Sequence, residues 1–254
     1  MLLLTTEKNY TTEKQLGEIM EEYLTIKENF DIISRNIVTA CEKTGRQNDV
    51  ILLGASKMND SDRINYAISQ GLRYIGENKV QELLEKYDAI DKDNVSIHFI
   101  GHLQSNKVKY IIDKVDMIQS LDSLSLAKEI DRQAKKHDKI MDVLVEINIG
   151  MEESKSGIAA EDVESFLNEV SKFENIRVLG LMSIPPVMTD EDTQRKIFQK
   201  IYKIYVDIST KNIHNVYMRY LSLGMSDDYT LAVEEGANLV RVGSALFGNR
   251  NYNK

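Results

Sequence analysis

The sequence predicts a single α/β domain folded as a (β/α)8 barrel. Three observations lead to this prediction: the chain has 254 residues, eight short apolar runs recur along it, and helical patterns separate them. Apolar runs that alternate with helices are typical of βα units in a parallel sheet. Eight such units in a chain of this length match a barrel in number and size. A doubly wound open sheet is the alternative, and the even spacing of eight strands favours the barrel.

The elements follow in order from the hydrophobic pattern. Residues 12–45 form an N-terminal helical segment, because apolar side chains recur there at helical spacing and Gly45 can end the helix. The expected strands are near-continuous apolar runs, as in parallel sheets covered on both faces. They lie at 50–55, 73–75, 96–100, 117–119, 141–147, 177–182, 218–223 and 238–242. The expected helices lie at 61–70, 79–87, 106–113, 123–137, 160–173, 191–211 and 227–235.

The composition limits the function classes. The chain has only 13 glycines and two prolines, and we expect residues 1–254 to form one domain with no flexible linker. It carries 32 basic and 40 acidic residues, a net charge of −8, which argues against binding nucleic acid through phosphates. No apolar run approaches the roughly 20 residues of a membrane span.

The cysteine content indicates a reducing compartment. Cys41 is the single cysteine, so an intramolecular disulfide is excluded, and we expect a packed, inert thiol within the first helix. Residues 1–6 lack the basic start of a secretory signal. We therefore expect a cytoplasmic protein. Because the chain is expected to form one domain, we also expect a monomer.

Two loops near the end of the chain predict a phosphate site. Gly224-Met225-Ser226 follows the seventh strand and Gly243-Ser244 follows the eighth, so each loop joins a glycine to a small hydroxyl residue before a helix. Barrels commonly hold phosphate at this pair of loops, with backbone N–H groups and a hydroxyl. Each loop alone would also fit a simple helix cap.

Lys57 is the second candidate. It ends the first apolar run, in which no other charge occurs, and should lie at the mouth of the barrel. A lysine there can form a Schiff base. The alternative is a structural lysine that reaches solvent or pairs with Glu77.

Arg241 connects the two candidates. It lies in the last apolar strand, two residues before Gly243. A Schiff-base lysine, a phosphate loop and an arginine able to reach a pyridine nitrogen together suggest pyridoxal 5′-phosphate. The alternative for Arg241 is a buried ion pair with a carboxylate. Other chemistries fit less well, because His98 and His102 lack a carboxylate at zinc-site spacing and no nucleotide-binding or G-x-S-x-G motif is present.

Seven segments carry a resemblance to a known family. The chain resembles the YggS/PROSC family, the pyridoxal phosphate homeostasis proteins, in order and at matching spacing. The matching segments are GASK at 54–57, GENKVQE at 76–82, HFIGHLQSNK at 98–107, a stretch from Asn148 through ESKSG at 153–157, GLMSIP at 180–185, LSLGMSDD at 221–228 and VRVGSALFG at 240–248.

The resemblance implies a fold and a site. The fold would be a single barrel of the alanine-racemase N-terminal-domain type, preceded by a helix and lacking the second domain of that enzyme. Pyridoxal phosphate would form a Schiff base with Lys57, and Arg241 would face the ring nitrogen, with Asn78 near the ring. The residues implied in phosphate binding are Ser226, Gly243 and Ser244, with Met225 beside them.

The resemblance also implies a role without demonstrated catalytic turnover. Such a protein would buffer the cofactor or deliver it to pyridoxal-phosphate-dependent apoenzymes, which are the expected partners. A racemase-like enzyme that uses Lys57 as a base is the alternative, and a Schiff-base aldolase would leave Arg241 unexplained. Two mild departures from the family pattern occur, at Met58-Asn59 and at Ala237-Asn238. Neither touches the expected contacts, although the first could change access to the Schiff base.

Overall fold

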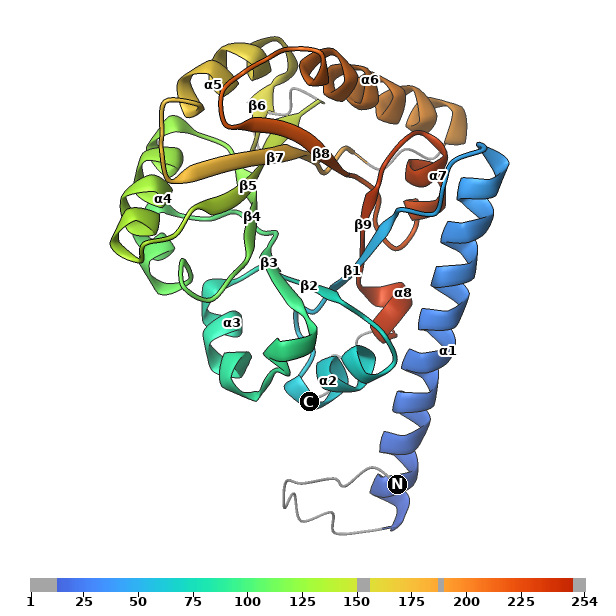
Figure 1. Ribbon diagram of the computed structural model, residues 1–254. Coiled ribbons are helices and arrows are strands. Elements are labelled where there is room, and N and C mark those ends of the chain that lie inside the picture. Colours follow the sequence, from blue (N-terminus) through green and yellow to red (C-terminus); the bar gives the residue numbers. More distant parts are fainter. Residues whose placement is uncertain (1–12, 150–155, 187–189, 249–254) are drawn as a thin grey trace.

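The protein is a closed parallel barrel with helices outside it (Figure 1). The computed structural model describes residues 13–149, 156–186 and 190–248. Within these residues, eight strands close the barrel in chain order, because β9 pairs with β1 in parallel. The strands are β1 (Ile51–Ala55), β2 (Tyr74–Glu77), β3 (Ser96–Phe99), β4 (Met117–Leu121), β5 (Met141–Asn148), β7 (Ile176–Ser183), β8 (Val216–Ser222) and β9 (Leu239–Val242). The predicted barrel is confirmed.

The helices form an outer ring around the strands (Figure 1). The α-helices are α1 (Glu13–Lys43), α2 (Ser61–Ser69), α3 (Val80–Lys86), α4 (Leu124–Lys136), α5 (Val163–Val170), α6 (Glu191–Ser209), α7 (Tyr229–Glu234) and α8 (Ser244–Phe247). Four short 3-10 helices join them in the described residues: η1 (Tyr87–Ala89), η2 (Lys92–Asn94), η3 (Ser105–Tyr110) and η4 (Ala160–Asp162).

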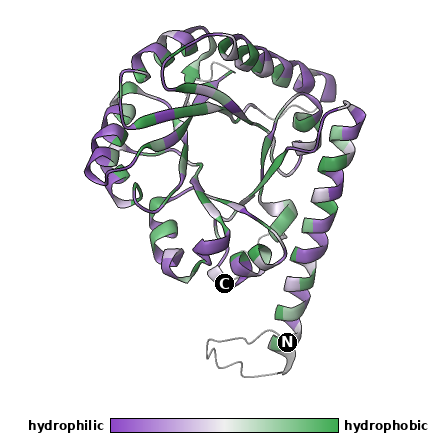
Figure 2. Ribbon diagram, in the orientation of Figure 1, coloured by the Kyte–Doolittle hydropathy of each residue, from purple (hydrophilic) through white to green (hydrophobic). Residues whose placement is uncertain are grey.

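Burial on both faces of the strands explains why they appear as continuous apolar runs. All residues of β4 and β9 are buried, because the helices cover one face and the barrel interior covers the other. The main core lies between the strands and the helices. A smaller cluster, which includes Leu53 and Leu239, lies on the same strand face as Arg241, because residues two apart share a face. Figure 2 shows apolar residues along the strands and polar ones around the periphery.

Helix α1 lies outside the ring and packs against α2, α7 and α8 (Figure 1). The pattern over 12–45 predicts one long helix or two, and the structure has one, whose described part begins at Glu13. Its buried face includes Ile26, Ile33 and Ile37. Gly45 follows the helix with a φ of +66°, a backbone conformation that glycine adopts without strain.

Two local features differ from the sequence prediction. The expected helix at 106–113 is the six-residue 3-10 helix η3, which ends at Tyr110. A strand that the pattern does not predict, β6 (Ile158–Ala159), adds two residues to the edge of β5. A two-residue strand carries too little hydrophobic periodicity to be read from a sequence.

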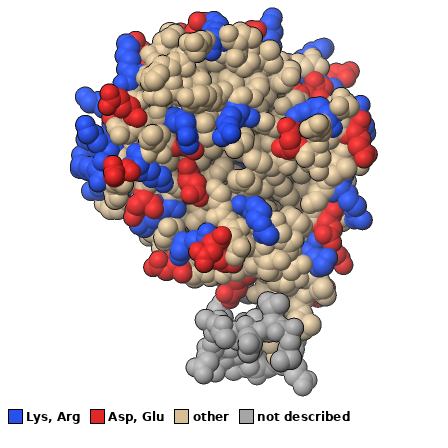
Figure 3. Space-filling view, viewed as in Figure 1, with Lys and Arg blue, Asp and Glu red and all other residues tan. Residues whose placement is uncertain are grey.

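The remaining expectations from the composition concern Cys41, membrane-spanning helices and surface charge. Cys41 is buried, which raises the pKa of its thiol and makes it less reactive. Among the described helices, none combines the length and the apolar character needed to cross a membrane. Figure 3 shows acidic and basic side chains interspersed on the face in view, so neither sign dominates that face.

Candidate functional site

The predicted site residues lie on four adjacent strands of the barrel. Asn78 follows β2, Lys57 follows β1, Arg241 lies in β9 and Ser226 follows β8. These strands are neighbours in the order β2-β1-β9-β8. Parallel strands bring their carboxyl ends to the same end of a barrel. The fold therefore brings these residues to one sector of the barrel mouth.

The turn that carries Lys57 is held by charged groups beneath it. The Lys86 ammonium donates hydrogen bonds to the backbone oxygens of Ser56 and Asn59, each at 3.0 Å. It also pairs with the buried carboxylate of Glu77 at 2.7 Å. The Ser56 hydroxyl donates to the same carboxylate at 2.5 Å. Glu77 thus forms its ion pair with Lys86, and the pair fixes the backbone on both sides of Lys57.

The residue after Lys57 has an unusual backbone conformation. Met58 has a φ of +61°, in the left-handed region that non-glycine residues rarely occupy. Its backbone N–H donates to a Glu82 carboxylate oxygen at 2.9 Å, which helps to hold the turn. Such strained conformations persist where the surrounding contacts hold them, often at functional sites.

The two candidate phosphate loops contact each other directly. The Ser226 hydroxyl oxygen accepts hydrogen bonds from the backbone N–H groups of Gly243 and Ala245, each at 3.2 Å. The Met225 backbone N–H donates to the Asp228 carboxylate at 2.7 Å. The loops after β8 and β9 therefore form one unit, in which a hydroxyl and several backbone N–H groups lie close together. Sequence reasoning predicted the two loops but did not predict this bond between them.

Arg241 is buried inside the barrel. Its guanidinium donates to the Ser222 hydroxyl at 2.5 Å and to the Ser183 backbone oxygen at 2.9 Å. Burial lowers its pKa to about 10, so the group stays charged at neutral pH. Among the described residues, no carboxylate lies within ion-pair distance of it. The alternative of a buried ion pair is therefore not found in this part of the chain.

A chain of buried hydrogen bonds continues from Arg241 across the barrel interior. The Ser222 hydroxyl donates to the side-chain oxygen of Gln119 at 2.7 Å. The Gln119 nitrogen then lies 2.8 Å from Nδ1 of His98. Burial lowers the pKa of His98 to about 4, so the imidazole is neutral and its Nδ1 accepts from the amide. This chain orients the Ser222 hydroxyl, and through it the guanidinium.

Four buried side-chain polar atoms lack a hydrogen-bond partner in the described structure: Nε of Arg63, Oε2 of Glu77, Oδ1 of Asn78 and Oγ of Ser120. Two of them lie at strand ends of the barrel, Asn78 after β2 and Ser120 in β4. A buried polar atom without a partner is costly and calls for a specific reason, such as a ligand. Gly101 packs so closely on Asn78 that a Cβ there would lie 2.2 Å from the Asn78 backbone oxygen. The position of Asn78 thus depends on this glycine.

Glu146 is an ionisable group that sequence reasoning missed. It lies in β5 and is 8% exposed. Burial, together with the nearby charge of Asp122, raises its pKa to about 7, while Arg241 and His102 oppose the rise. A charged residue within a strongly apolar strand is the sequence signal that could have identified it.

We expect Glu146→Gln to flatten the pH dependence of folding stability. The folded protein keeps the Glu146 proton up to about pH 7, whereas the unfolded chain releases it near 4.5. Stability from this group is therefore present at low pH and is lost as the pH rises between these values. The loss approaches about 3 kcal/mol by pH 8. Urea denaturation at pH 5, 6, 7 and 8 measures it.

Glutamine keeps the shape of the protonated side chain and cannot ionise, so the variant should be more stable than the wild type at pH 8. Glu18→Gln, on an exposed position of α1, is the matched control and should leave the pH dependence unchanged. A Glu146→Gln variant with the full wild-type pH dependence would contradict the prediction.

The chain is similar in sequence to known proteins. The family profile for the alanine racemase N-terminal domain matches residues 30–251. The pyridoxal phosphate homeostasis protein of Aquifex aeolicus is 42% identical over 89% of this chain and 98% of its own length. The protein of that name from Haemophilus influenzae is 34% identical over 90% of this chain and 98% of its own length. The chain belongs to the family of pyridoxal phosphate homeostasis proteins.

Solved structures support membership of the homeostasis family. A protein of unknown function from Bifidobacterium adolescentis superposes with a TM-score of 0.85 at 33% identity, covering 89% of this chain and 96% of that one. PipY of Synechococcus elongatus, solved with pyridoxal phosphate bound, gives a TM-score of 0.77 at 28% identity, covering 88% and 100%.

The homeostasis family shares its barrel with larger enzymes. Alanine racemase of Clostridium difficile gives a TM-score of 0.64 at 16% identity, over 87% of this chain and 60% of the racemase. At this identity the likeness concerns the fold alone. The resemblance seen in the seven sequence segments, and the racemase-type barrel that it implied, are both confirmed.

Proposed function

We propose that this protein binds pyridoxal 5′-phosphate covalently on Lys57 and acts in the homeostasis and delivery of that cofactor, without catalytic turnover. One observation carries the proposal: an amine, a buried guanidinium and a hydroxyl-bearing loop lie on the adjacent strands β1, β9 and β8. PipY, which has a matching fold, was solved with pyridoxal phosphate bound. The curated relatives carry the homeostasis name.

Each residue has a distinct role in this proposal. Lys57 supplies the amine, and the turn held by Lys86 and Glu77 keeps that amine at the barrel mouth. Arg241 stays charged at neutral pH and offers N–H donors to the ring nitrogen. When bound, the cofactor would supply an aldehyde group, with which the Lys57 amine could condense, releasing water. The residues proposed to hold the phosphate are Ser226, Gly243 and Ser244, with Met225 beside them.

The polar groups of the barrel mouth fit this cofactor. Asn78 and Ser120 each place a buried oxygen without a partner near the strand ends. A ligand with several polar substituents on a flat ring can satisfy such groups. The Arg241 guanidinium has no carboxylate partner among the described residues and has donors to spare. These features support placing the ring between Asn78 and Arg241.

Titration with pyridoxal phosphate tests the proposal. A near-visible absorption band should grow until one equivalent is bound. Borohydride should then fix the cofactor, and peptide mass mapping should find the reduced adduct on Lys57. The proposal fails if no saturable band forms, or if the adduct forms on other lysines while Lys57 stays unmodified.

The absence of turnover has its own test. Racemisation would exchange the α-hydrogen of an amino acid with solvent, so proton NMR in heavy water with the loaded protein detects it. We expect no exchange above the rate of free pyridoxal phosphate with any amino acid. Sustained exchange that is lost in Lys57→Ala would favour the racemase-like alternative.

The cellular context is part of the proposal. We propose a cytoplasmic monomer that passes its cofactor to pyridoxal-phosphate-dependent apoenzymes. The single, buried thiol of Cys41 supports a reducing compartment. Subcellular fractionation checks the location, and sedimentation of the purified protein checks the oligomeric state.

A further inference from the structure

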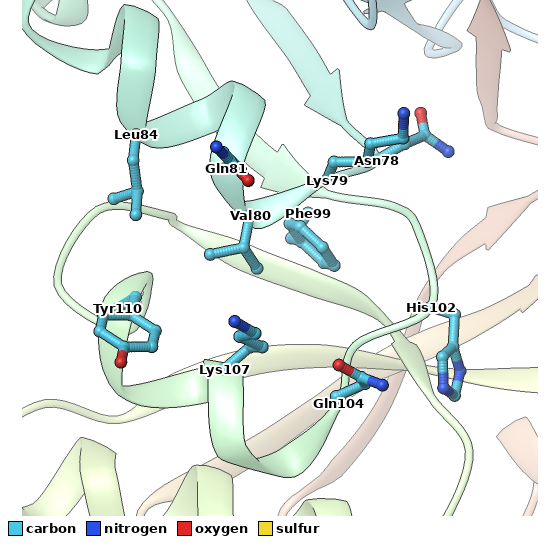
Figure 4. Close-up of a pocket in the computed structure, with 10 residues that line it drawn as sticks. All are labelled: Asn78, Lys79, Val80, Gln81, Leu84, Phe99, His102, Gln104, Lys107 and Tyr110. Atoms are coloured by element: carbon cyan, nitrogen blue, oxygen red, sulfur yellow. The ribbon is translucent and has the colours of Figure 1, made fainter.

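A cavity lies outside the barrel strands, between α3 and η3. It is an open cleft of about 490 Å³, within the range of sites for small molecules. Figure 4 shows its walls, with α3 on one side and η3 on the other. The lining residues are Asn78, Lys79, Val80, Gln81, Leu84, Phe99, His102, Gln104, Lys107 and Tyr110.

Three exposed polar side chains of the cleft form no hydrogen bond or ion pair with the described residues. In the part of the chain that the structure describes, the side chains of Gln81 and Gln104 make no hydrogen bond, and Lys107 makes no hydrogen bond or ion pair. The Lys107 ammonium lies 5.7 Å from the centre of the Tyr110 ring. In Figure 4, Gln81 and Lys107 lie on opposite walls of the cleft, with Val80 between them in this view. Polar side chains therefore line both walls.

The charge of the cleft is opposite to that of the whole protein. Its lining holds two lysines and no carboxylate, although the chain has a net charge of −8. Lys79 lies 3.4 Å from Glu82, outside the lining, whereas Lys107 has no such neighbour among the described residues. Between the polar groups lie the apolar side chains of Val80, Leu84 and Phe99.

We propose that this cleft binds a small organic anion with an apolar body. Lys107 holds the carboxylate or phosphate head, and the amides of Gln81 and Gln104 donate to it. The apolar body packs on Val80, Leu84 and Phe99. The cleft is separate from Lys57 and from the phosphate loops, although Asn78 borders both sites. The proposal does not depend on the function proposed above.

One end of the cleft borders the barrel mouth. Asn78 and His102 lie at one end of it, away from Leu84 (Figure 4). Its walls come from the segments 76–82 and 98–107, both of which carry the family resemblance. A ligand in the cleft would therefore contact the loop that carries Asn78.

Nuclear magnetic resonance of the ¹⁵N-labelled full chain tests the proposal at the level of single residues. The side-chain amide signals of Gln81 and Gln104, assigned with Gln→Asn variants, report on the cleft. We expect 4-methylpentanoate or phenyl phosphate to shift both signals saturably. The two probes distinguish a carboxylate ligand from a phosphate ester. Inorganic phosphate should bind at least fivefold more weakly than phenyl phosphate, because it lacks the apolar body.

Two comparisons test whether binding depends on the negative charge of the ligand and the positive charge of Lys107. The neutral 4-methylpentanamide should bind about fivefold more weakly than the carboxylate to the wild type, and Lys107→Gln should weaken carboxylate binding by a similar factor. Lys109→Gln, on the same 3-10 helix but outside the lining, is the matched control and should change affinity less than twofold. No saturable shift with either anion, or equal binding of the acid and its amide, would overturn the proposal.

Discussion

Lys57→Ala is expected to abolish covalent binding of pyridoxal phosphate while leaving the fold intact. The amine is the nucleophile of the proposed bond, and alanine has no group that can replace it. The near-visible band and the borohydride-stable adduct should both be absent, which is a complete loss. Lys57 is partly exposed, so the free energy of unfolding should change by less than about 1 kcal/mol.

Absorbance after borohydride reduction and intact mass measure this result. Lys200→Ala, at an exposed position of α6, is the control and should keep one equivalent of adduct. Weak binding through the phosphate loops can remain in Lys57→Ala, and equilibrium dialysis would detect it. Full retention of the reduced adduct in Lys57→Ala would refute the assignment of this lysine.

The second large effect is expected on folding stability, from the Lys86–Glu77 ion pair that holds the turn carrying Lys57. Lys86→Met should lower the free energy of unfolding by about 3–5 kcal/mol at pH 8, because it leaves a buried carboxylate without its cation. Glu77 is fully buried, and the Lys86 side chain is 11% exposed. Burial already raises the pKa of Glu77, and losing Lys86 raises it further. The penalty should therefore shrink as the pH falls and Glu77 takes up a proton.

Urea denaturation at pH 5 and pH 8 tests this prediction. Lys43→Met is the matched control, because Lys43 pairs with Glu234 at 3.0 Å but is 64% exposed. Its removal should cost less than about 1 kcal/mol at both pH values. The double variant Glu77→Gln, Lys86→Met should recover most of the stability. Equal losses in the free energy of unfolding for Lys86→Met and Lys43→Met would contradict the prediction that burial makes the Lys86–Glu77 pair the more important one.

The sequence predicted the barrel because its strands are buried on both faces. Such strands appear as separate apolar runs, and their number and spacing leave few arrangements open. The pattern failed where elements are short. Six residues of η3 and two of β6 contain too little periodicity to distinguish helix, strand and turn.

The site could be predicted only in part. Lys57 and Arg241 could be proposed from the sequence because a lone charge beside or within an apolar strand is conspicuous. The bonds from Arg241 to Ser222 and on to Gln119 join β9, β8 and β4, and Gln119 is 103 residues from Ser222. Such partners depend on how the closed barrel aligns its strands. A linear pattern does not contain that information.

The packing of α1 has a consequence for how the chain is made. Asn36 bonds Tyr229 of α7, 193 residues later, and Asn29 bonds the backbone of Leu246 in α8, 217 residues later. At about 5–20 residues per second, translation separates α1 from these partners by about 10–40 s. During that interval α2, which follows α1 closely in the sequence, is the partner of α1 that has already been made, and the contacts with α7 and α8 are still missing. Helix α1 can therefore complete its docking only when synthesis is almost finished.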